Sequence, residues 1–198
     1  HTKKALSLLD RHPSAVLVWS VLLHDIGKPA TMTEHDRIRF NGHDQAGAKM
    51  AGRVLRKMHS SNSLADGVEA CVANHMNMMQ VKQMRLGTLK KLLARPTIED
   101  ELELHRIDCL ASHGNMENYH FLREQQQRLA VEQVKPEPLL RGRDLLELGL
   151  QPGPLFGKIL STVYDMQLEE EVTTRDAALQ FVRERYLQGK NGVQLKFE

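Results

Sequence analysis

The sequence predicts an all-α protein. Aromatic residues make up only 5% of the 198 residues, whereas Leu, Ala, Glu, Gln, Arg and Met, which favour helices over strands, are abundant. Apolar residues also recur at the three- and four-residue spacing of an amphipathic helix through most of the chain. Apolar residues are 41% of the chain, and 27 basic side chains balance 25 acidic ones. This composition excludes a disordered tail and is typical of a globular protein with a sizeable core.

The helical periodicity defines the elements of the first two thirds of the chain. Seven helices are expected, at 3–11, 14–24, 43–58, 64–75, 88–94, 98–112 and 116–134. Between Lys28 and Phe40 the pattern changes to an alternation that indicates a loop or a short β-hairpin. Four methionines after the fourth helix are expected to pack in the core; they are Met76, Met78, Met79 and Met84.

Two prolines, Pro136 and Pro138, predict a break after the seventh helix, because proline cannot donate a backbone hydrogen bond and restricts its predecessor. We therefore expect a first domain at 1–134 and a small helical tail at 135–198. The tail is expected to hold helices at 142–148, 154–168 and 174–187, the last one capped by Thr173.

Charge is distributed unevenly along the chain. Residues 49–95 hold nine basic and two acidic side chains, a local charge of +7, and residues 96–134 hold three basic and eight acidic ones, a local charge of −5. A positive surface that attracts phosphate backbones and a merely solvated helix face both fit this pattern.

The two cysteines and the longest apolar run bear on the environment of the protein. Cys71 and Cys109 lack a CxxC partner, which argues against a disulfide framework and for a reducing, cytoplasmic setting. The longest apolar run, at 15–23, is about half the roughly 20 residues that span a bilayer, so no membrane partner is expected. The chain begins at His1 without the features of a signal peptide, and we expect it to be the C-terminal part of a longer protein.

The strongest chemical signal is the pair His24-Asp25 at the end of an apolar helix, where Gly27 is expected to stop that helix. A buried carboxylate needs a compensating charge, and imidazole together with carboxylate suits a divalent cation. Further candidates stand elsewhere in the chain. They are His1, His43, His75 and Asp108.

This arrangement resembles the HD superfamily of metal-dependent phosphohydrolases, whose signature is a histidine, a later His-Asp pair and a distal aspartate. The resemblance implies an HD-domain helical bundle with a metal held by His1, His24, Asp25 and Asp108. The metal would be Mg, Mn, Ni, Co, Fe or Zn, and the substrate a phosphate ester. His43 and His75 would bind a second metal or the substrate phosphate, although Asn74-His75 stands where members with several metals have a His-His pair. Catalytic roles fall to Asp25, His43 and Lys28, and Lys28 has a rival role as a cap of the helix C-terminus.

A narrower resemblance covers almost the whole chain. Segments 39–48, 108–114 and 142–160 look like the C-terminal half of bacterial tRNA nucleotidyltransferases and poly(A) polymerases. The Gly-Gly motif and paired aspartates of that family's catalytic head have no counterpart here, so we do not expect nucleotidyl transfer from these residues. The resemblance implies RNA, in particular tRNA, as a partner. Basic side chains expected to contact RNA are Lys90, Lys91, Arg95, Arg141, Arg143 and Lys158.

Three functions remain open from the sequence. The first is a metal-dependent phosphohydrolase that acts on phosphomonoesters or 2′,3′-cyclic phosphates. The second is a non-catalytic module that grips tRNA for the missing head, and the third is a stand-alone HD nucleotide phosphohydrolase.

Overall fold

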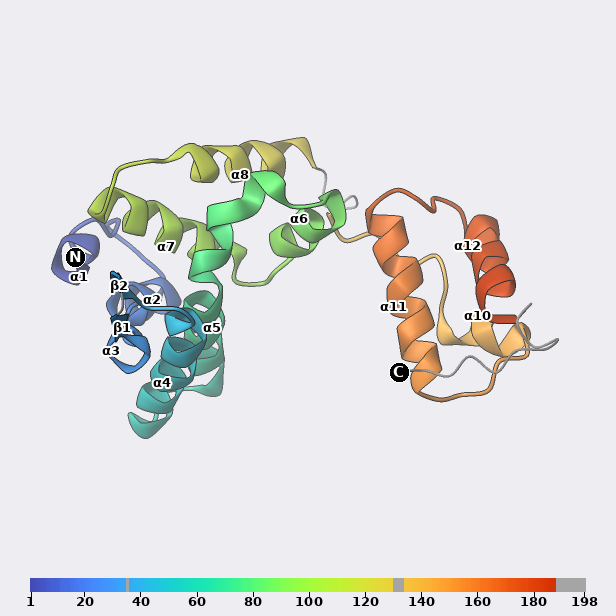
Figure 1. Cartoon of the computed structure of the whole chain (residues 1–198), viewed down its shortest axis with the longest axis horizontal. Helices are drawn as coiled ribbons and strands as arrows, with labels where there is room; N and C mark the ends of the chain where they lie inside the picture. The colour runs from blue at the N-terminus through green and yellow to red at the C-terminus, as the bar shows by residue number, and fades with distance from the viewer. Residues whose placement is uncertain (35, 130–133, 188–198) are drawn as a thin grey trace. The chain divides into compact units, whose positions relative to one another are not determined.

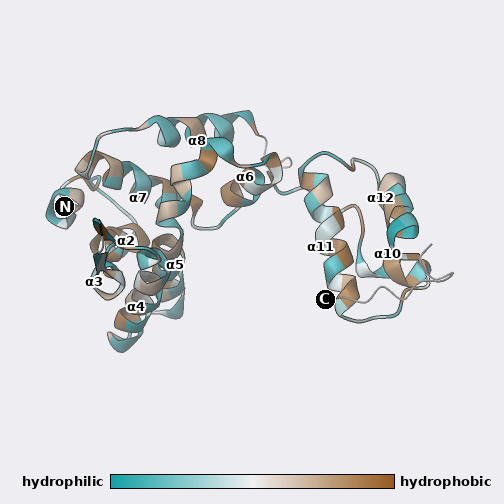
Figure 2. Cartoon of the chain, in the orientation of Figure 1, coloured by the Kyte–Doolittle hydropathy of each residue, from teal (hydrophilic) through white to brown (hydrophobic). Residues whose placement is uncertain are grey.

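The computed structural model describes residues 1–34, 36–129 and 134–187, and it confirms the all-α fold (Figure 1). The chain divides into two compact units. The first comprises His1–Met84 and Arg95–Arg128, and the second comprises Arg85–Ala94 and the chain from Leu129 onward. In both units the helices carry apolar and polar stripes (Figure 2), as expected of helices that bury one face.

The elements of the first unit are mostly helical and include one small hairpin. Their bounds are α1 (Thr2–Leu6), α2 (Ala15–Leu23), α3 (Lys28–Thr31), β1 (Thr33–Glu34), β2 (Ile38–Arg39), α4 (His43–Lys57), α5 (Asn62–Asn74), the 3-10 helix η1 (His75–Gln83), α7 (Ile98–Ala111) and α8 (Glu117–Arg128). The hairpin expected between Lys28 and Phe40 is confirmed, because β1 pairs antiparallel with β2 and Thr33 lies opposite Arg39. Helix α1 is shorter than expected, and η1 was not expected at all.

Helix α2 is the central element of the first unit. Its N-cap is Ser14, whose hydroxyl accepts a hydrogen bond from the Leu17 amide at 2.9 Å. Val21 packs in one cluster with α5 and α7, and Leu23 packs in another with α4 and α5. Because two clusters cover it, α2 is apolar on most of its surface, and Val21, Leu23 and His24 at its end are buried.

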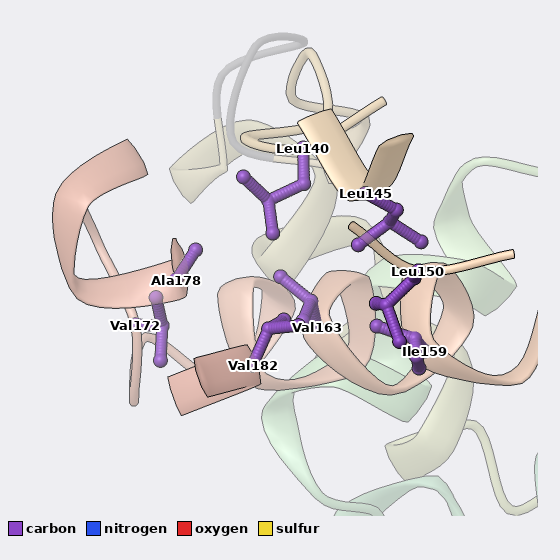
Figure 3. Close-up of a cluster of buried hydrophobic side chains, with 8 residues drawn as sticks. All are labelled: Leu140, Leu145, Leu150, Ile159, Val163, Val172, Ala178 and Val182. Carbon is purple, nitrogen blue, oxygen red and sulfur yellow. The ribbon is translucent and has the colours of Figure 1, made fainter. Parts of the chain in front are cut away.

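The second unit has its own core, shown in Figure 3. Its elements are α6 (Leu86–Leu93), α10 (Gly142–Glu147), α11 (Pro154–Leu168), α12 (Arg175–Val182) and the π-helix η2 (Arg183–Leu187). Ile159 and Val163 of α11 pack in this cluster with Leu145 of α10 and Val182 of α12. The cap of α12 is Thr174 rather than Thr173, because the Thr174 hydroxyl accepts from the Ala177 amide.

The boundary between the units differs from the expected one at residue 134. Helix α6, which we had assigned to the first domain, packs against α11 of the second unit. The predicted helix at 116–134 begins at Glu117 and continues as α8 to Arg128. Part of the predicted remainder, residues 130–133, lies outside the described residues.

Among the described residues, no helix combines the length and the apolar character needed to cross a bilayer.

Candidate metal centre

Four side chains that the sequence proposed as ligands converge in the first unit. The Nε2 atom of His1, at the N-cap of α1, lies 3.1 Å from Nε2 of His24 and 3.0 Å from Oδ1 of Asp108 in α7. His24 is the C-cap of α2, and its Nε2 lies 3.4 Å from Oδ2 of Asp25 and 3.8 Å from Oδ1 of Asp108. Residues up to 107 positions apart thus surround one point. The convergence follows from packing α1, α2 and α7 around a shared cluster that includes Ala5, Val21 and Leu104.

A second group adjoins the first. His43 begins α4 and His75 follows α5, and their Nε2 atoms are 3.2 Å apart. The Nε2 atom of His43 also lies 3.7 Å from Oδ1 of Asp25. Asp25 therefore directs Oδ2 toward His24 and Oδ1 toward His43, so that a single carboxylate is shared by both groups.

Three of the histidines are oriented in the same way. His24, His43 and His75 each hold Nδ1 against the carbonyl oxygen of the residue three positions earlier, at 2.9, 2.8 and 2.6 Å. Because a carbonyl only accepts, Nδ1 carries the proton, and Nε2 of the neutral ring presents a lone pair. This is the orientation in which a backbone carbonyl fixes a metal-ligating histidine.

The donor set fits a divalent cation. In neutral His43 and His75 the two facing Nε2 lone pairs cannot hydrogen bond to each other, and a cation between them would satisfy both. One donor atom each from His1, His24 and Asp25 lies within 4.8 Å of the others, and the same holds for Asp25, His43 and His75. Donor atoms 3 to 4 Å apart are compatible with metal bonds of about 2.0–2.2 Å.

Gly27 lets the backbone of α4, which carries His43, pass close to the chain that follows His24 and Asp25. An ideal Cβ at Gly27 would lie 2.1 Å from the carbonyl oxygen of His43 and 2.6 Å from the backbone nitrogen of Gly47, so the backbone of α4 passes directly over this position. We expected Gly27 to end α2, and this was wrong. Its φ is −78°, it is the N-cap of α3, and α2 already ends at Leu23. The requirement for glycine is therefore steric.

The charges of Asp25 and its neighbours are coupled. Burial alone would raise the pKa of Asp25, but hydrogen bonds from His24 and Lys28 outweigh it and hold this pKa well below its usual range. Burial likewise would lower the pKa of His24, yet the bond and charge of Asp25 give a net increase. His75 has no such partner, and burial lowers its pKa. Asp25 is thus an anion to which Lys28 donates; His24 donates to it only when its ring is protonated, and in the neutral ring Nε2 is available to a cation instead.

Lys28 belongs to the centre and does not cap α2. Its Nζ donates to Oδ2 of Asp25 at 2.7 Å, and it is the first residue of α3. The same Nζ lies 5.7 Å from the centre of the Phe40 ring, a cation–π distance.

A cavity of about 650 Å³ opens over both groups. Five of the proposed ligands line it, namely His1, Asp25, His43, His75 and Asp108. It also takes in side chains that we had not proposed. These are Arg37, Ile38, Arg39, Phe40, Asn41, Met76, Met79, Ser112 and His113. The sequence did offer one indication that these residues line the site, because they follow Lys28, His75 and Asp108 closely along the chain.

The expectation that Met76 and Met79 lie in the core was wrong. Of the four methionines after α5, Met78 is fully buried, whereas Met76 and Met79 are 41% and 52% exposed.

The basic side chains proposed to contact RNA are engaged within the protein. Lys90 is only 3% exposed, and its Nζ donates to the Leu168 carbonyl and to Glu170. This burial contradicts the expected place of Lys90 on a surface. Lys91 pairs with Asp165 at 2.5 Å, and Arg95 pairs with the fully buried Glu101 at 2.9 Å.

In the tail, Arg141 and Arg143 form exposed ion pairs at 3.2 Å with Glu137 and Glu147. Lys158 is exposed at the start of α11. These three side chains remain on a surface of the second unit, and contact with RNA stays a prediction for them.

Fold and ligand geometry together define a helical protein with a candidate centre for divalent cations. Comparison with known proteins gives the family. The model of tRNA nucleotidyltransferase domain 2 matches residues 44–182, and the chain belongs to this family.

Two relatives align over most of the chain. An A-adding tRNA nucleotidyltransferase of Deinococcus radiodurans is 30% identical over 92% of this chain and 45% of its own length. A CC-adding tRNA nucleotidyltransferase of Thermus thermophilus is 28% identical over 82% of this chain and 38% of its own length. The chain therefore spans less than half the length of these relatives. No solved structure gives a significant match.

Proposed function

We propose that the first unit binds one or two divalent cations and hydrolyses a phosphate ester, either a phosphomonoester or a 2′,3′-cyclic phosphate. The observation that carries this proposal is the shared carboxylate of Asp25, with one oxygen toward each group of histidines. His1, His24, Asp25 and Asp108 would hold one cation, and Asp25, His43 and His75 a second. Bound divalent cations lower the pKa of a water molecule and neutralise phosphoryl oxygens.

The protein's own groups orient the ester. Lys28 sits at the cavity with its Nζ fixed by Asp25, where it can meet an anionic oxygen of the phosphate. Arg37 adds a second cation to the same cavity. The carbonyl bonds at Nδ1 keep His24, His43 and His75 in one tautomer, so that these rings need no rearrangement on binding.

The family suggests the source of the ester. The two relatives are named for adding A or CC to tRNA, and this chain corresponds to less than half of them. We propose that nucleotidyl transfer belongs to parts of such a protein outside these residues, and that the ester here is at an RNA end in a reducing, cytoplasmic setting. A stand-alone nucleotide hydrolase has less support, because the family match continues through the tail to residue 182.

A basic stripe on α4 favours a second function, the binding of tRNA. Lys49, Arg53 and Lys57 are exposed at successive four-residue steps, so they lie on one face of the helix. The opposite face of α4 carries Ala48, Ala51 and Leu55, which are buried in the core. RNA binding and hydrolysis are compatible, since the stripe and the centre use different residues.

The test is metal content and hydrolysis in matched variants. After chelation and reloading with Mn²⁺, the wild type should retain metal and hydrolyse at least one of p-nitrophenyl phosphate, a monoester, and bis(p-nitrophenyl) phosphate, a diester. Asp25→Asn should lose most of the bound metal and about 100-fold or more of the rate, because it removes the shared anion. Asp66→Asn changes an exposed carboxylate that pairs with Arg56 on another part of the unit, and it should match the wild type. Equal metal content and rate in Asp25→Asn and the wild type would refute the proposal.

A further inference from the structure

We infer that Ile38, Phe40, Met76 and Met79 form a seat for the base of a nucleotide whose phosphate lies at the metal centre. The inference rests on the proposed function and deepens it, because it identifies the group that the cavity recognises besides phosphate. All four side chains line the same cavity as the ligands.

The seat is apolar and open to solvent. Ile38 is 53% exposed, Met76 41% and Met79 52%, and Phe40 is half-buried. Ile38 lies opposite Glu34 in the hairpin, and Met76 and Met79 lie on η1, one and four positions after His75. Solvent-exposed apolar side chains gathered at a polar centre indicate a ligand site, since covering them with an apolar group is favourable. Methionine also adapts its shape and contacts aromatic rings well.

The cavity also has the charge for the other end of the same ligand. Lys28 and Arg37 line it together with the candidate metal ligands. The Lys28 ammonium lies 2.7 Å from Asp25 and 5.7 Å from the centre of the Phe40 ring, so it joins the anionic centre to the apolar seat. A ligand that satisfies both ends carries a phosphate and, a short distance away, a flat apolar group. A nucleotide has this composition.

Size and hydrogen bonding agree with this ligand. A cavity of about 650 Å³ is within the range of small-molecule and cofactor sites. Asn41 lines it as well, and its amide offers both donors and an acceptor for the edge of a base. A small phosphate such as a sugar phosphate would leave the four apolar side chains uncovered.

The experiment compares two ligands that differ only in the base. Binding of adenosine 5′-monophosphate and of ribose 5-phosphate to Mn²⁺-loaded protein is measured by calorimetry, and released phosphate is assayed in the same samples so that the heat of hydrolysis is separated from the heat of binding. We expect the nucleotide to bind at least tenfold more tightly. Met79→Ala and, separately, Ile38→Ala should weaken nucleotide binding about five- to tenfold and leave ribose 5-phosphate binding unchanged. Met58→Ala is the matched control, because Met58 is 55% exposed at the end of α4 and does not line the cavity.

The possible outcomes separate the two proposals. Equal affinity for the two ligands in the wild type, or no effect of either seat variant on nucleotide binding, would overturn the base seat. A seat variant that weakens both ligands equally would also overturn it, since that result reports damage to the phosphate site. Failure of the proposed function is seen differently, as absence of bound metal in the wild type or as hydrolysis of neither the monoester nor the diester.

Discussion

At the scale of single residues, Gly27 is the tightest point of the candidate centre. The atoms that a Cβ would meet are the His43 carbonyl oxygen and the Gly47 nitrogen, both backbone, so neither can rotate away. Gly27→Ala should therefore lower the free energy of unfolding by about 2 kcal/mol or more, and it should also reduce metal binding by displacing His43.

Urea unfolding measures the free energy of unfolding of Gly27→Ala, and a glycine in the second unit provides the control. Gly157 lies within α11 and has nothing within 4 Å of an added Cβ, so Gly157→Ala should leave stability unchanged or raise it by up to about 1 kcal/mol. If both substitutions have the same effect, the close approach at Gly27 has no energetic importance.

Cys71 gives a prediction about pH. Burial, with a further contribution from the charge of Glu101, raises its pKa to about 12. The thiol of the folded protein should therefore resist iodoacetamide at pH 8, whereas the same thiol should react in urea. Between about pH 9 and 12 only the unfolded state ionises, so stability should fall as the pH rises through this window. Rapid labelling of Cys71 in the folded protein at pH 8 would contradict this.

The sequence predicted the candidate ligands better than their surroundings. His1, His24, Asp25 and Asp108 could be selected because their order along the chain resembles the HD signature, and because imidazole with carboxylate suits a cation. The reason for Gly27 could not be predicted, since it depends on α4 packing over that position. The exposure of Met76 and Met79 could not be predicted either. It depends on which side chains of η1 face the core, and the apolar residues of η1 show no clear helical period in the sequence.

At the scale of elements, the basic stripe of α4 leads to a test of RNA binding. Replacing Lys49, Arg53 and Lys57 with glutamine should weaken tRNA binding and flatten its dependence on salt, since fewer phosphates are neutralised. Filter binding at several salt concentrations measures the slope. The control removes three exposed charges that are not on this stripe, with Lys3, Arg11 and Arg128 replaced by glutamine. Equal slopes for the two variants would show that α4 is not the contact surface.

The positive segment at 49–95 shows why a charge count along the chain did not predict a surface. The segment crosses both units, because Arg85–Ala94 packs with the second unit and Arg95 returns to the first. Lys90 is itself buried and pairs with the exposed Glu170, and Arg95 pairs with the fully buried Glu101. Periodicity predicted the existence of α4 and α6 correctly, but the partner of α6 is set by long-range packing that the pattern does not contain.

At the scale of the whole molecule, the position of α6 predicts the result of shortening the chain. Helix α6 buries Leu89, Leu92 and Leu93, and its main partner is α11. A chain that ends at Arg128 lacks α11, so it should expose this apolar face and aggregate or unfold at a lower temperature than the full chain. Light scattering and thermal unfolding measure this. A soluble shortened chain with an unchanged Tm would show that α6 does not need the rest of the second unit.

Ion binding should also affect the stability of the first unit as a whole. A ligand that binds only the folded state stabilises it by about 2.7 kcal/mol at one hundred times its Kd. Thermal unfolding at increasing Mn²⁺ should therefore show a rising Tm for the wild type and little rise for Asp25→Asn. A Tm that does not depend on Mn²⁺ in the wild type would contradict this.

His1 and Asp108 are far apart along the chain, so an ion that both of them hold would also affect stability. An ion held by both would act as a cross-link that closes a loop of more than one hundred residues, and the entropy lost on closing a loop grows with its length. Helix α1 has five residues and fully buries only Ala5, and Leu6, Leu8 and Leu9 pack partly buried against the same cluster. The ion would add to the packing that joins α1 to α7, so its removal would weaken the contact between these two helices at the same place where it stops the chemistry.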